Sequence, residues 1–337
     1  MIIRENVEIS SLSTMKIGGV ARYVFEIEKT ADISEILPKL EELGLKKYYF
    51  LGSGANTFAT DAGFDGAIIL NKIKGIEVKE KENKVLFLAY GGENWDDFVE
   101  KTVELGCTGV ECLAGIPGTV GAAPVQNIGA YGQEVKDSIS EIYVYDMKEN
   151  NFLHLKPEDC NFSYRRSIFN SSERGRYFIY AVEFMLKKGE MKTELYRSLA
   201  TYLEEKNISS REPKVLADAV RKIRDKKLPK PEEEASSGSF FKNIYVERDR
   251  IAELDERGIP HHGTKVNTGW LIEKAGLLGK TFYGFRVSEK AALVLINDSA
   301  KSYSDLKKAV AEISKIVEEK FGFKLEQEPN VIGKEND

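Results

Sequence analysis

The sequence predicts a globular protein that mixes α-helices and β-strands in two or three domains. Its 337 residues can bury several hydrophobic cores. Hydrophobic residues make up 42% of the chain and charged residues 31%, as in soluble globular proteins. Apolar segments with helical spacing alternate with short strand-like runs, and two glycine-rich loops interrupt this pattern.

Cysteine content and charge narrow the function classes. The odd number of cysteines and their irregular spacing predict neither a disulfide framework nor a metal site, and they fit a reducing cytoplasm: Cys107, Cys112 and Cys160. A net charge of −5 argues against non-specific nucleic-acid binding. No window approaches ~18 uninterrupted apolar residues, and the first residues lack a signal-peptide pattern. We therefore expect neither a membrane span nor a leader.

The N-terminal third is predicted to alternate strands and helices. Strands are expected where short apolar runs are bounded by glycine or polar residues, at 23–27, 47–51, 66–71 and 85–90. One helix is expected to begin at an N-cap, Thr30, and to end at Gly44 with a kink at Pro38. A second helix is expected to be capped by Asn94 and to end at Gly106.

The rest of the chain continues this mixture. Strands are expected at residues 141–147, 152–155, 176–186 and 292–296, the first two as a hairpin, and a last strand in the tail. Residues 190–227 are expected to turn helical, and 270–275 form an apolar segment. A domain boundary is expected near Pro229 and Pro231. The final helix should be capped near Ser304 and should stop at Gly322.

A glycine-rich stretch, residues 111–135, is the first candidate binding site. It contains no Lys, Arg or Asp, and its five glycines are Gly115, Gly118, Gly121, Gly129 and Gly132. Glycine tolerates positive φ and lets backbone N–H groups approach a ligand. A run of such groups can form a concave site for a pyrophosphate. The alternative is an irregular core loop.

A second glycine loop, LGSGANTF, directly follows the strand at residues 47–51. It lacks the third glycine of the dinucleotide-binding fingerprint, and the residues after it do not open a helix. Alone it also fits a tight turn. Beside the first loop it predicts a second wall of one phosphate site, where Ser53 and Asn56 add side-chain donors.

Three further side chains suit anion or proton chemistry. Arg165, in YRRS, has a planar and permanently charged fork that fits a carboxylate. Ser239, between Gly238 and two phenylalanines, has a hydroxyl in an apolar setting that favours proton delivery. Glu328 is a carboxylate in the tail. The alternatives are a surface arginine pair, a turn serine beside core aromatics and a solvated tail carboxylate.

Several strings, in order, resemble the UDP-N-acetylenolpyruvoylglucosamine reductase family: LGSGANTF, GVECLAGIPGTVGAAPVQNIGAYGQEV, FSYRRSIF, KKLP, SGSFFKN, TGWLIEKAGLLG and LEQE…IG. The match runs from about Ser13 to Gly333, and GIPGTVGAAPVQNIGAYG and GSFFKN are specific as whole strings. This family consists of flavoenzymes that complete UDP-N-acetylmuramate in peptidoglycan synthesis. Residues 192–199, with Tyr196, resemble the segment of the family's longer class that closes over the substrate.

The resemblance implies an α+β fold with a two-part FAD-binding region of the PCMH/vanillyl-alcohol-oxidase-like type and a C-terminal α+β substrate domain. Residues 1–72, joined by the tail 324–337, and residues 73–229 would together hold FAD, and residues 230–323 would cover the substrate. It also implies non-covalent FAD, NADPH as hydride donor and UDP-N-acetylglucosamine enolpyruvate as substrate. A cytoplasmic monomer without membrane or nucleic-acid partners is expected.

The resemblance also implies roles for single residues. Ser239 would protonate carbon 2 of the enolpyruvyl group, and Arg165 and Glu328 would stabilise the enolate-like intermediate left after hydride reaches carbon 3. The implied substrate contacts are Tyr131, Tyr196, Lys227 and Asn243, and Lys227 is also a candidate NADPH contact. The implied FAD-binding residues are Gly52, Ser53, Gly54, Ala55, Asn56, Gly115, Ile116, Pro117, Gly118, Thr119, Gly121 and Ala122.

The chain departs from the family at three positions. Ile259 and Ala291 stand where relatives place a substrate-contacting tyrosine and a polar residue. Pro329 follows Glu328 where valine or isoleucine is common, so Glu326 remains a second candidate for the acidic partner. These departures concern substrate contacts and the identity of that carboxylate.

Two other functions are compatible with the sequence. One is an oxidase of the vanillyl-alcohol-oxidase-like class, many of whose members attach flavin through histidine. The three histidines of this chain lie outside the glycine loops, which favours non-covalent FAD and the reductase. The other is a flavin- or nucleotide-binding protein without catalysis, in which Ser239, Arg165 and Glu328 need not converge.

Overall fold

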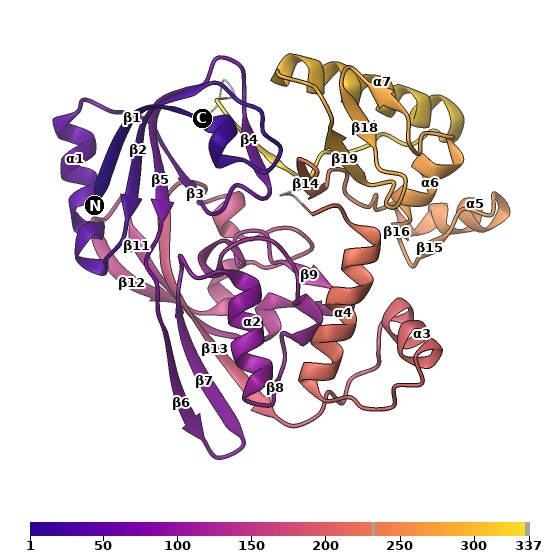
Figure 1. The fold of residues 1–337 in the computed structure, drawn as a ribbon, viewed down its shortest axis with the longest axis horizontal. Helices are drawn as coiled ribbons and strands as arrows, with labels where there is room; N and C mark the ends of the chain where they lie inside the picture. Colours follow the sequence, from indigo (N-terminus) through magenta and orange to yellow (C-terminus); the bar gives the residue numbers. More distant parts are fainter. Residues whose placement is uncertain (231–232, 334–337) are drawn as a thin grey trace. The chain divides into compact units, whose positions relative to one another are not determined.

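The structure is a computed structural model that describes residues 1–230 and 233–333 (Figure 1). The chain divides into two compact units. Unit 1 consists of Met1–Glu5, Arg22–Ser53 and Gly66–Arg224, and unit 2 of Asn6–Ala21, Gly54–Asp65 and the described part of 225–333. Each unit has a hydrophobic core of its own. Over the described ranges, no helix has both the length and the apolar character needed to cross a membrane.

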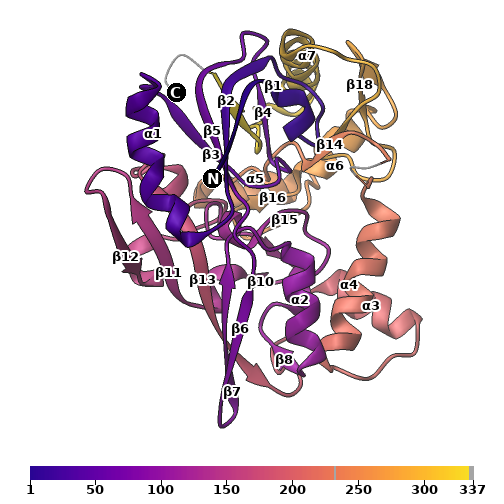
Figure 2. The same ribbon diagram turned by 60° about the vertical axis from the view of Figure 1, so that its left-hand side comes forward.

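A four-stranded sheet in the order β1–β2–β5–β3 lies largely in unit 1. Its strands are β1 (Ile2–Glu8), β2 (Val20–Ile27), β5 (Phe64–Asn71) and β3 (Tyr48–Leu51). β3 runs parallel to β5, with Leu51 opposite Leu70. Helix α1 (Ile36–Glu42) lies beside this sheet in Figure 2 and buries Ile36 and Leu40 against its core. The strands expected at 23–27, 47–51 and 66–71 are confirmed.

The start of the first helix differs from the prediction. A 3₁₀ segment, Thr30–Glu35, precedes α1, and the Lys29 N–H ahead of it donates to the Asp32 carboxylate over 3.1 Å. Thr30 is therefore the first residue of the segment and not its cap. Pro38 lies in the first turn of α1, where a missing amide hydrogen does not interrupt the helix, so the expected kink is not required.

A six-stranded antiparallel sheet forms the middle of unit 1. Its order is β12–β11–β13–β7–β6, with β8 paired to β13. The strands are β6 (Ile76–Lys81), β7 (Lys84–Tyr90), β8 (Cys107–Thr108), β11 (Ile139–Asp146), β12 (Asn151–Leu155) and β13 (Tyr177–Lys188). The predicted hairpin and the strands at 85–90 and 176–186 are confirmed. The prediction missed β6 because its sequence, IEVKEK, is mostly charged and exposed.

The two faces of this sheet pack against different layers, because strand side chains alternate. On one face, Val144, Val182 and Phe184 share a core with helices α2 (Trp95–Glu104), α3 (Arg197–Glu205) and α4 (Pro213–Lys227). On the other face, Tyr145 and Phe178 share a core with the first sheet and α1. α2 and α4 lie side by side in both views (Figures 1 and 2). Residues 190–227 are thus two helices rather than one continuous segment.

Two of the expected helix signals hold for α2. The Asn94 side chain accepts from the Asp96 and Asp97 amides over 2.8 and 3.1 Å, which is an N-cap. Gly106 follows the helix with φ 68°, the left-handed conformation that glycine adopts at little cost. The start of α2, to which the glycine-rich stretch is anchored, is therefore fixed by its own sequence.

Unit 2 is built on a sheet in the order β14–β19–β18–β17. Its strands are β14 (Ser236–Ser239), β17 (Thr281–Phe282), β18 (Phe285–Val287) and β19 (Val294–Asn297). Unit 2 also has a separate two-stranded hairpin, which consists of β15 (His261–His262) and β16 (Lys265–Val266). Its helices are α5 (Ile251–Glu256), α6 (Thr268–Lys274) and α7 (Tyr303–Phe321). The apolar segment at 270–275 belongs mainly to α6. Ser302 caps α7, not Ser304, and Gly322 ends it as predicted.

The tail returns to unit 2 as a strand. β20 (Asn330–Ile332) pairs in parallel with β4 (Thr57–Ala59), so the expected last strand is confirmed. Ahead of it, Phe241 and Gln327 form an antiparallel bridge. The division into three domains at residues 72, 229 and 323 stays a prediction, and Pro231 at the expected boundary lies outside the described residues.

Candidate cofactor and substrate site

The first residue of the shorter glycine loop, Gly52, lies beside the longer glycine loop within unit 1. A Cβ built on Gly52, directly after β3, would lie 3.0 Å from the Thr119 Oγ1 atom and 3.1 Å from the Ala122 Cβ atom. Both distances are shorter than ordinary van der Waals contact, so a side chain at residue 52 would require its neighbours to move by a few tenths of an ångström. The chain passes from unit 1 to unit 2 after Ser53.

The longer loop is anchored to the segment between β7 and α2. The Trp95 amide donates to the Gly118 carbonyl over 3.1 Å, and the Val120 amide donates to the Glu93 carbonyl over 2.9 Å. The Gly121 amide donates to the Gly91 carbonyl over 2.9 Å, and a Cβ on Gly121 would lie 3.0 Å from the Gly91 Cα atom. Gly121 is therefore needed for close backbone packing.

The backbone amides of the glycine-rich stretch fall into two groups: those that donate within the protein and those that remain available to a ligand. The amides of Gly115, Gly121 and Ala122 donate within the protein. Across the described chain, the amides of Ile116, Gly118 and Thr119 have no protein acceptor. Gly118 has φ 149° and no atom within 4 Å of a built Cβ. This short segment leaves room and donors for an anion. The sequence predicted a run of ligand-binding amides along the glycine-rich stretch, but in the structure only part of that stretch has amides available to a ligand.

Arg165 lies at the tip of a two-residue turn. Ser163 and Arg166 exchange backbone hydrogen bonds of 3.0 and 3.1 Å, with Tyr164 and Arg165 between them. Arg165 has φ 55°, a left-handed conformation that is uncommon for a residue with a side chain. It is half-buried, and its Nη1 donates to the Gly129 carbonyl over 3.3 Å, whereas Arg166 is exposed. The interpretation as a plain surface pair therefore does not hold for Arg165.

Asn127, which the sequence analysis missed, holds this turn against the glycine-rich stretch. It is 1% exposed and has φ 45°. Its Nδ2 donates to the Ser163 carbonyl over 3.2 Å and to Glu134 Oε2 over 3.0 Å, and its Oδ1 accepts from the Lys136 amide over 3.2 Å. One buried amide thus links three segments. The available signal was an asparagine, a residue able to adopt positive φ, inside a string of mostly small and apolar residues.

Two tyrosines predicted to hold substrate lie together near the same stretch. Tyr131 is at the tip of a hairpin formed by β9 (Gly129–Ala130) and β10 (Gln133–Glu134), with φ 48°. Its ring centre lies 6.2 Å from that of Tyr196 in an edge-to-face contact, and Tyr196 is 55% exposed. Burial raises the pKa of Tyr131, so its hydroxyl is protonated at neutral pH and can donate a hydrogen bond.

A carboxylate belongs to the same hairpin. Burial opposes ionisation of Glu134, but hydrogen bonds from Lys136 and Asn127 outweigh that effect and lower the pKa of Glu134. Arg165 adds to this lowering through its charge. Glu134 is therefore ionised at neutral pH. It serves as the negative partner that helps to hold the arginine turn and the glycine-rich stretch in one arrangement.

The tail brings Ser239 and Glu328 close together in unit 2. The Glu328 amide donates to the Phe240 carbonyl over 2.8 Å, next to Ser239 in sequence. Ser239 and Glu328 are half-buried, and Phe240 is fully buried. Glu326, by contrast, is exposed and forms an ion pair with Lys242. This geometry favours Glu328 over Glu326 as the acidic partner.

The remaining predicted residues of unit 2 have diverse surroundings. Asn243 is half-buried, and its Oδ1 accepts from the Thr268 amide over 3.2 Å. Lys227 is exposed at the end of α4. Ile259 is 3% exposed and belongs to the core of unit 2, and Ala291 is half-buried. Since these residues lie in unit 2 and Arg165, Tyr131 and Tyr196 lie in unit 1, the meeting of the two sets stays a prediction.

Comparisons with known proteins match both parts of the chain. The family of the UDP-N-acetylenolpyruvoylglucosamine reductase C-terminal domain matches residues 230–332, and an FAD binding domain matches residues 21–149. A UDP-N-acetylenolpyruvoylglucosamine reductase of Neisseria gonorrhoeae is 36% identical over 338 residues, covering 97% of each chain. The chain belongs to the UDP-N-acetylenolpyruvoylglucosamine reductase family. FAD is its cofactor.

Similar solved structures agree with this family. A UDP-N-acetylenolpyruvylglucosamine reductase from Thermus caldophilus aligns with a TM-score of 0.69 at 21% identity, covering 98% of this chain and 100% of that one. A VAO-type flavoprotein from Myceliophthora thermophila aligns with a TM-score of 0.50 at 10% identity, covering 89% and 70%. The fold is therefore α+β, with an FAD-binding region of the PCMH/vanillyl-alcohol-oxidase-like type and a C-terminal substrate domain, as predicted.

The glycine loops fit FAD on structural grounds. FAD carries a pyrophosphate, and the available amides of Ile116, Gly118 and Thr119 are the donors that such an anion needs. Gly118 presents no side chain that would block its approach. The named FAD-binding residues remain a prediction, and this segment is the part of it with the best structural support.

We predict that Gly52→Val weakens FAD binding roughly tenfold or more, because overpacking in a tight contact costs about 1–3 kcal/mol. Gly52 does not have a positive φ, so the substitution tests packing without adding strain from a left-handed backbone conformation. The measurement is FAD release from diluted holoprotein, followed by flavin fluorescence. Gly269→Ala in α6 is the matched control, since its built Cβ has no neighbour closer than 3.5 Å. If Gly52→Val released FAD at the wild-type rate, the loops would have adapted to the added side chain.

Proposed function

We propose that this chain reduces UDP-N-acetylglucosamine enolpyruvate to UDP-N-acetylmuramate with NADPH as hydride donor, in the synthesis of peptidoglycan precursors. Family membership over 97% of the chain supports the reaction. The structural observation that carries it is the pairing of the tail with residues 240–242, in which the Glu328 amide donates to the carbonyl of Phe240, the residue after Ser239. When bound, FAD would supply the hydride chemistry between NADPH and carbon 3 of the enolpyruvyl group.

Arg165 stabilises the charge that hydride addition creates. Addition to carbon 3 moves negative charge toward the substrate carboxylate, and a permanently charged, planar guanidinium matches that group. The turn around Arg165 is held by its backbone bridge and by Asn127. A cation fixed in advance stabilises the transition state more than the ground state, because it does not have to reorganise during the reaction.

Ser239 donates the proton that completes the reduction. Hydride reaches carbon 3, the Ser239 hydroxyl proton goes to carbon 2, and the serine regains a proton from solvent. NADPH becomes NADP⁺, so electrons and protons balance. The neighbouring Phe240 and Phe241 are buried, and an apolar surrounding limits competition from water. Glu328, which the tail places beside Phe240, takes part in stabilising the enolate-like intermediate.

The remaining roles belong to binding. Tyr131 and Tyr196 in unit 1, and Lys227 and Asn243 in unit 2, hold the substrate, and Lys227 also contacts NADPH. The exposure of Tyr196 and its contact with Tyr131 suit a side chain that closes over bound substrate, as in the longer class of the family. The chain works as a monomer in the cytoplasm, where its nucleotide substrates occur. It has no membrane or nucleic-acid partner.

The Ser239→Ala variant tests this assignment. Alanine is nearly isosteric, so folding, FAD content and reduction of the flavin by NADPH should survive. Reoxidation of the reduced flavin by UDP-N-acetylglucosamine enolpyruvate should slow by ~10²–10⁴-fold, because a positioned general acid is lost. Ser239→Cys, which still carries a proton, should recover part of the rate. Stopped-flow absorbance separates the two half-reactions, and a parent-like reoxidation rate for Ser239→Ala would exclude Ser239 as the acid.

A paired substitution tests which tail carboxylate takes part. Glu328→Gln should slow flavin reoxidation by about tenfold or more, since a group that contacts the reacting atoms is changed. Glu326→Gln is the matched control and should stay near the wild-type rate, because Glu326 is exposed and pairs with Lys242. The same stopped-flow assay applies to both variants. A larger effect at Glu326 would reverse the assignment.

A further inference from the structure

The Gly115 residue is held on both sides by charged side chains from two helices. Its amide donates to Asp96 Oδ1 in α2 over 2.7 Å. Its carbonyl accepts from Arg224 Nε in α4 over 3.0 Å. Gly115 has φ 69°, and a Cβ there would lie 3.3 Å from Arg224 side-chain atoms. Neither amide nor carbonyl of this residue is left for a ligand.

This arrangement sets the direction of the next amide. The Gly115 carbonyl and the Ile116 N–H belong to one trans peptide, in which the two groups point in opposite directions. Because Arg224 holds the carbonyl toward α4, the Ile116 N–H is directed away from α4. Ile116 carries the first of the three available amides, ahead of Gly118 and Thr119. Fixing Gly115 therefore orients the first donor of the predicted anion site.

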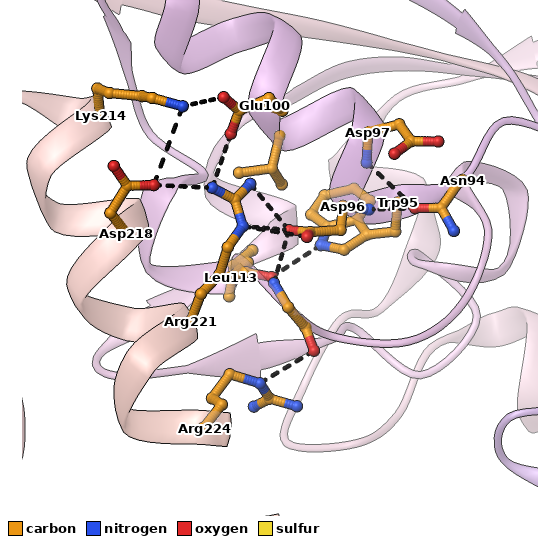
Figure 3. A network of polar contacts seen from close by, with 12 residues as sticks. Asn94, Trp95, Asp96, Asp97, Glu100, Leu113, Lys214, Asp218, Arg221 and Arg224 are labelled. Carbon is orange, nitrogen blue, oxygen red and sulfur yellow. Dashed lines mark hydrogen bonds and ion pairs between the residues drawn. The ribbon is translucent and has the colours of Figure 1, made fainter. Parts of the chain in front are cut away.

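Asp96 is itself held by a network of charges between α2 and α4 (Figure 3). Arg221 donates from Nε to both Asp96 oxygens over 3.1 and 3.0 Å, and from Nη2 over 3.1 Å. Arg221 Nη1 also lies 2.7 Å from Glu100 Oε2, and Glu100 forms an ion pair with Lys214. Bidentate arginine–carboxylate pairs fix geometry as well as charge. The Asp96 carboxylate is thus preset toward the Gly115 amide.

The Asp96–Gly115 contact is supported by further hydrogen bonds between the first turn of α2 and the glycine-rich stretch. Trp95, next to Asp96, donates from its ring nitrogen to the Leu113 carbonyl over 2.9 Å (Figure 3). The Trp95 amide donates to the Gly118 carbonyl over 3.1 Å. The first turn of α2 therefore holds the glycine-rich stretch at Leu113, Gly115 and Gly118. Among these contacts, only the one at Gly115 joins a charged side chain to a loop amide.

We propose that Asp96 is a positioning residue for FAD: with Arg221 and Arg224, it fixes the Gly115 peptides so that the following amides face the cofactor's pyrophosphate. This inference rests on the proposed use of the glycine-rich stretch for FAD. Asp96 acts through the backbone and does not contact the cofactor. The negative charge of Asp96 is satisfied by Arg221, so it does not repel the pyrophosphate as an unpaired carboxylate would.

The test compares substitutions within the same network, in the full-length holoprotein. Asp96→Asn weakens both the Arg221 pair and the acceptor for Gly115, and FAD release on dilution should accelerate about tenfold, as expected for loss of one charge-assisted hydrogen bond. Glu100→Gln is the matched control, since it also removes ion pairs between α2 and α4 but does not touch Gly115. It should release FAD within about twofold of wild type.

A second readout separates positioning from general destabilisation. With added FAD, turnover by Asp96→Asn should approach the wild-type maximum while the half-saturating FAD concentration rises about tenfold. Asp96→Glu keeps the charge but displaces the carboxylate, so it serves as a milder variant if Asp96→Asn does not fold. Equal FAD release from Asp96→Asn and Glu100→Gln would overturn the proposal. Tight FAD binding without substrate turnover in the wild type would instead contradict the proposed reaction.

Discussion

The site depends on the close approach of chain segments at positions that glycine occupies. Gly121 packs against Gly91, and Gly52 packs against Thr119 and Ala122. A Cβ at either glycine would meet neighbouring atoms at about 3.0 Å. Close packing of this kind leaves little room for relaxation. Because one loop follows β3 and the other adjoins α2, the sheet and the helix that position them also determine the geometry of the predicted FAD site.

Strained residues occur where the proposed chemistry needs fixed side chains. Tyr131, Arg165 and Asn127 all have positive φ without being glycine. Such conformations cost free energy and persist when surrounding contacts over-determine them. Here the contacts are specific: the Asn127 side chain bonds to the Ser163 carbonyl, and Arg165 bonds to the Gly129 carbonyl. The arginine turn and the tyrosine hairpin are therefore one preorganised cluster within unit 1.

Sequence periodicity predicted the elements with strong local patterns. α2 with its Asn94 cap, the β11–β12 hairpin and the end of α7 at Gly322 were expected and are observed. It failed for β6, whose charged residues hide a strand that pairs with β7, and it placed the α7 cap two residues late. Local sequence patterns do not show which segment a strand will pair with. They therefore predict helices and strands that bury an apolar face, and they miss an exposed, charged strand such as β6.

The candidate site was predicted from whole sequence motifs that resemble a known family, and not from the chemical properties of single residues alone. The sequence singled out the glycine loops, Ser239 and Arg165 as candidates, but not Asn127 or Asp96. Asn127 acts through the Ser163 carbonyl, 36 residues away, and Asp96 acts through the Gly115 amide, 19 residues away. These are tertiary contacts between residue types that are common on surfaces and in caps. Only the folded backbone shows that each holds a loop of the site.

The most direct test of the proposed reaction is anaerobic mixing of the purified wild-type protein with NADPH and then with UDP-N-acetylglucosamine enolpyruvate, followed by visible flavin absorbance. The account predicts that NADPH bleaches the flavin and that the UDP-sugar restores the oxidised spectrum while UDP-N-acetylmuramate forms. Acid precipitation of the same sample should release the flavin into the supernatant, as non-covalent FAD requires. A flavin that stays reduced with the UDP-sugar and is reoxidised only by oxygen would contradict the reductase and favour an oxidase.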